Sequence, residues 1–183
     1  TSLTYLGYLA EGARTNLCLQ SENLATTWTN FSSTESTNII SSPDGTADAD
    51  AVNEDGTAAT THGMAQTFVK AASAIQYSVS MFVKAANRSW IAIEGNDTVS
   101  IARAYFNVGS GVVGTIFVSG TYASGGSSIT AYPNGWYRCV FVYTTPATTA
   151  DDMNVYIAEA DNDVTFDGLS QTSLYIWGVQ KEA

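Results

Sequence analysis

The feature that most constrains the fold is a succession of short runs in which large apolar and polar residues alternate, separated by clusters of Gly, Asn, Asp, Ser and Thr. Alternation at every second residue is the pattern of a β-strand with one buried face, and no stretch keeps a helical apolar period over three turns. About a dozen short strands favour two packed sheets. The sequence therefore predicts an all-β fold, a two-sheet antiparallel β-sandwich of the jelly-roll type, as a single domain over residues 1–183.

The strands are predicted from patterns of two strengths. The stronger patterns cover residues 74–85, 90–94, 102–108, 136–143, 153–158 and 173–179. The weaker patterns cover residues 15–20, 37–40, 47–52, 64–70, 112–118 and 128–131. Turn-forming residues dominate 26–37 and 41–63, which we expect to form surface loops, and the glycines in 109–114 and 120–128 predict hairpin turns.

The segment NGWYRCVFVY, which begins at Asn134, shows the pattern most clearly. Its Asn-Gly dipeptide predicts a turn that opens a strand. Alternation sends Tyr137, Cys139, Phe141 and Tyr143 to one face, which is large and uncharged and should face the core. The opposite face carries Trp136, Arg138, Val140 and Val142.

The same alternation places an aromatic or cationic residue opposite the core in three further predicted strands. Aromatic rings offer a rigid apolar surface that can stack on the apolar face of a sugar ring, while neighbouring polar groups bind its hydroxyls. The predicted ligand-binding face consists of Trp90, Arg103, Tyr105, Trp136, Arg138 and Tyr156. This assignment assumes no β-bulge, and the alternative for each residue alone is burial under a loop or a subunit.

The charge balance excludes several partners. The chain has seven Lys and Arg against seventeen Asp and Glu, with a formal net charge of -10. Neutralisation of phosphates dominates nucleic-acid binding, so we expect no nucleic acid as a partner, and an anionic membrane surface is disfavoured for the same reason. No apolar run approaches the length of a membrane span, so no membrane insertion is expected.

Nothing in the sequence indicates catalysis. His62 is the only histidine, and a structural hydrogen-bonding role is favoured for it. A glycosidase needs two carboxylates across a cleft, and sequence spacing selects no pair. No phosphate-binding loop, dinucleotide fingerprint or CxxC motif is present. The chain is therefore not expected to be an enzyme, and no catalytic residue is assigned.

Metal and thiol chemistry remain open at this point. The run from Glu159 through Asp161 and Asp163 alternates oxygen ligands much as a calcium loop does, but lacks the glycine and terminal Glu of an EF-hand. A solvated acidic turn and a calcium site are the two interpretations, and no cofactor is required. Cys18 and Cys139 are too few for a disulfide scaffold; free thiols are favoured over a single bridge, with Cys18 expected to point away from the core.

A resemblance adds to this reading. The opening YLAEGARTNLCLQSENLATTW resembles the start of a domain that recurs in bacteriophage and prophage virion proteins, where a phrase close to EGARTNLLLQSENF with a following Trp is common. Further phrases are similar in the same order along nearly the whole chain. They are SPDGTADADAV, THGMAQTF, YSVSMFVKA, ARAYFNVGSGVVG, NGWYRCVFVY and SLYIWGVQKE.

That family in turn resembles the β-sandwich carbohydrate-binding modules of glycan-degrading enzymes, whose opening phrase is echoed by Asn16, Leu17, Glu22 and Trp28. The resemblance implies a jelly roll with a virion or extracellular location that attaches a phage or phage-like particle to surface polysaccharide or oligosaccharide. Such modules commonly end in an Asp-Asp pair that helps hold a structural calcium; residues 176–179 carry no carboxylate, so Glu22 is left as an incomplete match.

The alternative function is a structural or assembly domain of a tail fibre or head spike. In that case the aromatic face lies in a subunit interface and the chain forms a homo-oligomer, a trimer if it is fibre-borne.

Overall fold

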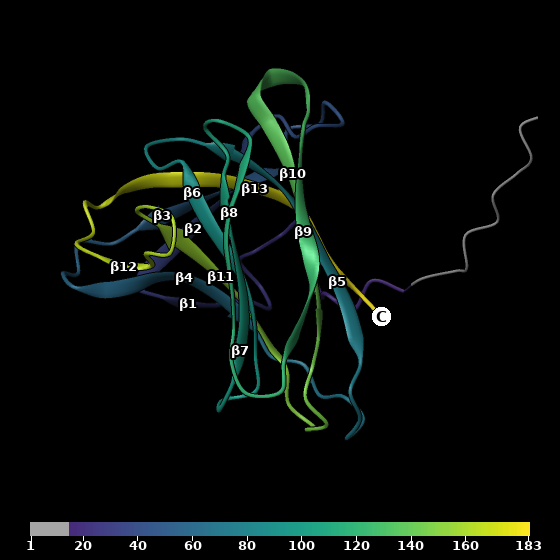
Figure 1. Cartoon of the computed structure of the whole chain (residues 1–183). Helices are drawn as coiled ribbons and strands as arrows, with labels where there is room; N and C mark the ends of the chain where they lie inside the picture. Colours follow the sequence, from purple (N-terminus) through teal and green to yellow (C-terminus); the bar gives the residue numbers. More distant parts are fainter. Residues whose placement is uncertain (1–14) are drawn as a thin grey trace, which may run out of the picture.

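The structure, a computed structural model, describes residues 15–183, which form two antiparallel sheets packed face to face (Figure 1). The first, here called sheet A, has the order β1 (Thr29–Phe31), β4 (Thr60–Gln66), β11 (Asp152–Ala158), β6 (Trp90–Asn96), β7 (Ile101–Asn107), β8 (Val112–Val118), with β12 (Thr165–Phe166) paired to β4. The second, sheet B, has the order β2 (Ser33–Ile40), β3 (Ala49–Glu54), β13 (Gln171–Glu182), β5 (Gln76–Ala85), β10 (Trp136–Thr144), β9 (Ala123–Ala131). The predicted two-sheet antiparallel sandwich of the jelly-roll type is confirmed.

The core lies between the two sheets and follows the predicted alternation. On β10, Cys139, Phe141 and Tyr143 are completely buried, and the facing side of β5 contributes Val79 and Met81. Register pairs Cys139 with Met81 and Phe141 with Val79, so the inward side chains of adjacent strands meet directly. Burying side chains of this size stabilises the fold by about 1.5–3 kcal/mol each, which fixes the register of the central strands.

The polar edges of the sheets are where the predicted elements were wrong. The expected loop 26–37 contains β1 and the start of β2. The expected loop 41–63 contains the start of β4 and also β3, which the weaker pattern over 47–52 had predicted. Residues 120–128 form much of β9 rather than a hairpin turn, because β8 and β9 lie in different sheets. Residues 15–20 form no strand. Edge strands such as β2, with the sequence STESTNII, bury little side-chain surface and so lack the apolar alternation that marks a strand.

The turn predicted at Asn134-Gly135 is confirmed. Asn134 and Gly135 have φ values of 61° and 78°, the left-handed region that Asn and Gly tolerate best. The amide of Tyr132 donates to the carbonyl of Trp136 at 2.8 Å and closes the β9–β10 hairpin. A short 3-10 turn, η1 (Pro133–Gly135), occupies the loop.

Both cysteines are free and buried. Cys139 lies in the core as predicted, but Cys18 is only 6% exposed and packs in the same core cluster, so its expected outward orientation is wrong. The segment around Cys18 is not a strand, and its side chains therefore do not follow strand alternation. Burial raises the pKa of the Cys18 thiol to about 12, which keeps it protonated at neutral pH.

One ion pair lies inside the sandwich. Lys181 on β13 donates to the Asp151 carboxylate at 2.5 Å, and both side chains are fully buried. A bulge between Trp177 and Gln180, where Gly178 has φ 62°, reverses the facing of β13 and turns Lys181 inward. No helix within residues 15–183 is long and apolar enough to cross a membrane.

Candidate functional site

The six residues predicted to form one ligand-binding face lie on two different sheets. Trp90, Arg103, Tyr105 and Tyr156 belong to β6, β7 and β11 of sheet A, whereas Trp136 and Arg138 belong to β10 of sheet B. All six lie opposite the core, as alternation predicted, but the outer faces of a sandwich point in opposite directions. A single continuous face made of all six residues is therefore wrong.

Trp136 is a structural residue rather than part of an accessible platform. Its side chain is 1% exposed, and its indole Nε1 donates to the carbonyl of Ser41 at 3.2 Å. The loop that follows β2 thus contacts the first residue of β10 and covers it. The expectation that this indole is open to solvent is wrong, and the alternative of burial under a loop holds for it.

The four predicted residues of sheet A lie on its outer face, which also carries a polar cluster. Strand register places Asn154, Glu94, Arg103 and Phe117 side by side on β11, β6, β7 and β8. A neighbouring row brings Tyr156 and Tyr105 to either side of Ala92. Because Ala92 is small, the two tyrosines and Arg103 can converge over it.

Arg103 is held at the centre of this face by its neighbours. Its Nε donates to Glu94 Oε2 at 2.7 Å, its Nη2 also pairs with Glu94, and its Nη1 donates to the hydroxyl of Tyr105 at 3.1 Å. The guanidinium carbon lies 4.7 Å from the ring centroid of Tyr156. Burial opposes the charged form of Arg103, but the adjacent Glu94 carboxylate outweighs that effect and raises the pKa of Arg103.

Glu94 anchors the cluster and was not among the predicted site residues. Its side chain is fully buried, and its Oε1 accepts from Asn154 Nδ2 at 2.8 Å, from the Tyr156 hydroxyl at 3.1 Å and from Asn96 Nδ2 at 3.3 Å. Burial and the Glu94 charge raise the pKa of Tyr156 to about 12, so its hydroxyl stays a donor. Glu94 and Arg103 stand at outward positions of adjacent strands, and this pairing of opposite charges was the sequence signal that could have identified them.

A covering loop, residues 159–164, crosses this face and buries part of it. Both carboxylate oxygens of Asp161 contact β8, accepting from the Thr115 amide at 2.7 Å and the Thr115 hydroxyl at 3.0 Å. Val164, the last residue of the loop, packs against Ala92, Tyr105 and Ala158, and Trp90 and Tyr156 flank this second apolar cluster. Tyr105 is consequently 1% exposed, so it supports the site from below instead of offering its ring to a ligand.

The carboxylates considered as metal ligands serve the loop itself. Glu159 pairs with Arg88 at 3.1 Å, Asp161 binds Thr115, and Asp163 accepts from the Thr165 amide at 3.1 Å. Glu22 is exposed elsewhere, in a polar hollow beside Asp48. Within residues 15–183, no group of three or more His, Cys, Asp or Glu side chains is arranged to hold a metal ion.

A hollow of about 310 Å³ opens between the covering loop and β8. Arg103 and Tyr105 line its floor, Phe117 lies on one side, and Asn162 and Asp163 of the covering loop lie on the other. Phe117 is 47% exposed, so its ring is available to a ligand. The volume falls at the small end of the range of about 300–1,000 Å³ that ligand pockets occupy.

His62 has the structural role that was favoured for it. Its side chain is fully buried, its Nδ1 lies 2.7 Å from the carbonyl oxygen of Ser32, and its ring stacks on Phe166 with centroids 4.6 Å apart. These contacts tie β4 to β12 and to the segment between β1 and β2.

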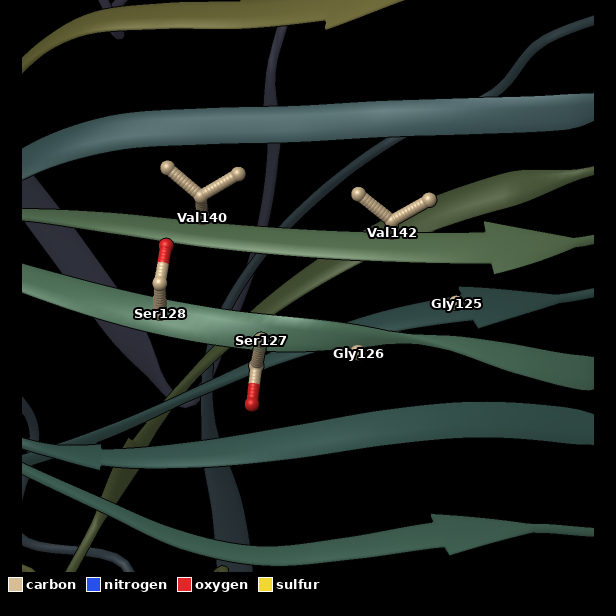
Figure 2. A pocket seen from close by; sticks show the side chains of 6 residues that line it. All are labelled: Gly125, Gly126, Ser127, Ser128, Val140 and Val142. Atoms are coloured by element: carbon tan, nitrogen blue, oxygen red, sulfur yellow. The ribbon is translucent and has the colours of Figure 1, made fainter.

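The outer face of sheet B carries a second group of aromatic and cationic side chains. Phe82 packs edge-on against Tyr132 with ring centroids 4.9 Å apart, and Trp177 lies 5.5 Å from Phe82 on the other side. Arg138 is paired in register with Phe82. Beyond Arg138, a hollow of about 270 Å³ lies on the β9–β10 hairpin. Figure 2 shows the side chains of Val140, Val142 and Ser128 on the same side of this hairpin, and Gly126 leaves open space there.

Comparison with known proteins gives matches among solved structures but not among sequence families. No family model and no curated protein matches the sequence. Among solved structures, the chain is similar to the CBM22-1–GH10 modules of endo-1,4-β-D-xylanase 10B from Clostridium thermocellum, complexed with xylohexaose. The TM-score is 0.48 at 13% sequence identity, and the match covers 92% of this chain but only 28% of that chain.

Proposed function

We propose that this chain is a non-catalytic glycan-binding module and that its site is the hollow at Arg103 on the outer face of sheet A. The observation that carries the proposal is a guanidinium fixed by a buried carboxylate at the floor of an open hollow with an exposed aromatic ring at its side. Sugars present hydroxyls on their edges and apolar C–H groups on their faces, and the hollow offers partners for both.

Arg103 keeps donor capacity for a ligand. An arginine has about five N–H donors. Glu94 takes one from Nε and one from Nη2, and Tyr105 takes one from Nη1, which leaves two of the five. Because Glu94 is itself held by Asn154 and Tyr156, the remaining donors are oriented before a ligand arrives, which lowers the entropic cost of binding.

The site can be tested with variants that leave the fold intact. Phe117→Ala should weaken binding to a glycan identified on an array by about tenfold, the loss of one aromatic contact at the centre of a small site. Ile116→Ala is the matched control, since Ile116 neighbours Phe117 on β8, is 37% exposed and faces the other way. Arg103→Lys keeps the charge but not the planar fork and should also weaken binding. Equal binding by parent, Phe117→Ala and Arg103→Lys would refute this site.

The biological setting is proposed from the sequence resemblance alone. The module would belong to a phage or phage-like particle, with a virion or extracellular location, and would attach that particle to surface polysaccharide. Binding of the purified chain to the surface of a host, and its inhibition by the isolated polysaccharide, would test this setting.

The alternative function, a structural or assembly domain of a fibre or spike, is favoured by edge strand β8. Val112, Ile116, Phe117 and Val118 are 52%, 37%, 47% and 42% exposed on it, and an edge strand with exposed apolar side chains is a template for another chain. Sedimentation at high concentration distinguishes the two functions. A stable homo-oligomer, such as a trimer, that Phe117→Ala dissociates supports assembly, and a monomer supports the glycan site.

A further inference from the structure

Four of the six described cations have partners inside the fold. Of the seven Lys and Arg, only Arg14 lies outside residues 15–183. Arg88, Arg103 and Lys181 form ion pairs, and the ammonium of Lys70 is capped by the carbonyls of residues 71, 73, 146 and 148. Within the described part of the chain, only Lys84 and Arg138 have neither an ion pair nor such a set of carbonyl partners.

These two cations lie together on the outer face of sheet B. Arg138 pairs in register with Phe82, and Lys84 pairs with Trp136, so Lys84 and Arg138 are diagonal neighbours on adjacent strands. Diagonal neighbours on one face of a sheet are about 7–8 Å apart, close enough for both side chains to contact one carboxylate. The one polar partner of Arg138 is Ser80, whose hydroxyl accepts from Nη2 at 3.2 Å, which leaves most of the guanidinium open.

The surroundings of the cation pair fit a ring-shaped ligand with an apolar face. Tyr132, 39% exposed, stands beside Phe82 at one end. At the other end lies the hollow of Figure 2, whose apolar surface comes from Val140 and Val142 and whose hydroxyl comes from Ser128. Gly125 keeps this hollow open, since a Cβ there would lie 2.6 Å from Val142 Cγ1.

We propose that the outer face of sheet B is a second binding site, specific for a carboxylated saccharide such as a uronic-acid polymer. Arg138 and Lys84 bind the carboxylate, and the aromatic and glycine-floored surfaces on either side bind the sugar rings. The net charge of -10 repels anions over most of the surface. An anionic ligand is therefore bound only where its carboxylate contacts the two cations directly. Glu182 lies on the same face, paired with Ser78 at the far end of β5, and limits how far an acidic chain extends in that direction.

The experiment compares retention of the protein on polygalacturonate with its retention on the methyl ester, which has the same backbone without the charge. Alginate, hyaluronan and polysialic acid are tested as further acidic polymers. We expect retention on at least one acidic polymer, loss on esterification, and weakening as salt rises from about 0.05 to 0.5 M. The double variant Arg138→Gln/Lys84→Gln should bind the acidic polymer at least about tenfold more weakly than the parent.

The control for net charge is Ser110→Glu/Ala147→Glu, which makes the same charge change at exposed loop positions away from this face. It should bind as the parent does. Failure to bind any acidic polymer, equal binding to polygalacturonate and its ester, or equal loss in the control variant would each overturn the proposal. Phe117→Ala should leave acidic binding unchanged, so the outcome is independent of the site at Arg103.

Discussion

Replacing Lys181 by Met should destabilise the protein strongly, because it leaves Asp151 charged in the interior without a cation. Both side chains are fully buried, and the ammonium also lies 4.0 Å from the ring centroid of Phe68. Breaking a buried pair by removing one partner costs about 3–5 kcal/mol. Asp151 retains hydrogen bonds from Tyr122 at 2.8 Å and Tyr143 at 3.3 Å, so we expect the lower part of this range.

The measurement is urea unfolding followed by tryptophan fluorescence, with the free energy extrapolated to water. The double variant Lys181→Met/Asp151→Asn removes both charges and should recover most of the loss, because the desolvation of the carboxylate disappears with it. Glu182→Gln is the control, since Glu182 neighbours Lys181 but faces outward; it should change stability by less than about 0.5 kcal/mol. A loss below about 1 kcal/mol in Lys181→Met, or a double variant no more stable than the single one, would refute the reasoning.

Two further predictions concern the carboxylates of Glu54 and Asp161. Burial acts to raise the pKa of Glu54, but the Arg88 guanidinium and further donors outweigh it and lower that pKa below its ordinary 4.5. The charged Glu54 therefore stabilises the folded state above pH 4.5, and this contribution is lost as pH falls through the lowered pKa. Glu54→Gln should remove this contribution from an acid unfolding curve. Asp161→Ala removes both hydrogen bonds from the covering loop to Thr115. It should speed proteolysis within residues 159–164 and leave the midpoint of urea unfolding nearly unchanged. Protection from proteolysis equal to that of the parent would show that the packing of Val164 alone holds the loop.

The sequence was sufficient to predict which side chains of the central strands point into the core, but not which strands share a sheet. Alternation correctly separated inward from outward residues on β6, β7, β10 and β11. Which strands share a sheet depends on pairings between distant segments, such as β10 with β5 and β11 with β6, and alternation carries no information on them. The predicted face therefore combined residues that lie on opposite sides of the molecule.

β13 shows a second limit of alternation. Leu174 and Ile176 face the core, and unbroken alternation would send Lys181 to solvent. The bulge at Gly178 reverses the facing, so that Val179 and Lys181 point inward beside Asp151. A glycine inside a strand pattern is a sign of such a bulge, but only the pairing with β5 fixes where the reversal occurs.

The covering loop explains why aromatic residues alone were poor markers of the site. Trp90 and Tyr105 lie opposite the core as a ligand platform requires, yet Val164 and the loop around it pack on them and make that side a second apolar cluster. Glu94 is a better marker, because a carboxylate on an outer face could remain in water at no cost. Burying this carboxylate costs several kcal/mol, and a single ion pair offsets that cost only in part. Glu94 is nevertheless buried and bonded to Arg103, Asn154 and Tyr156. This arrangement indicates that holding the Arg103 guanidinium in place is worth the cost. The buried Glu94 therefore ties the proposed glycan site to Arg103 more firmly than the aromatic side chains of the outer face do.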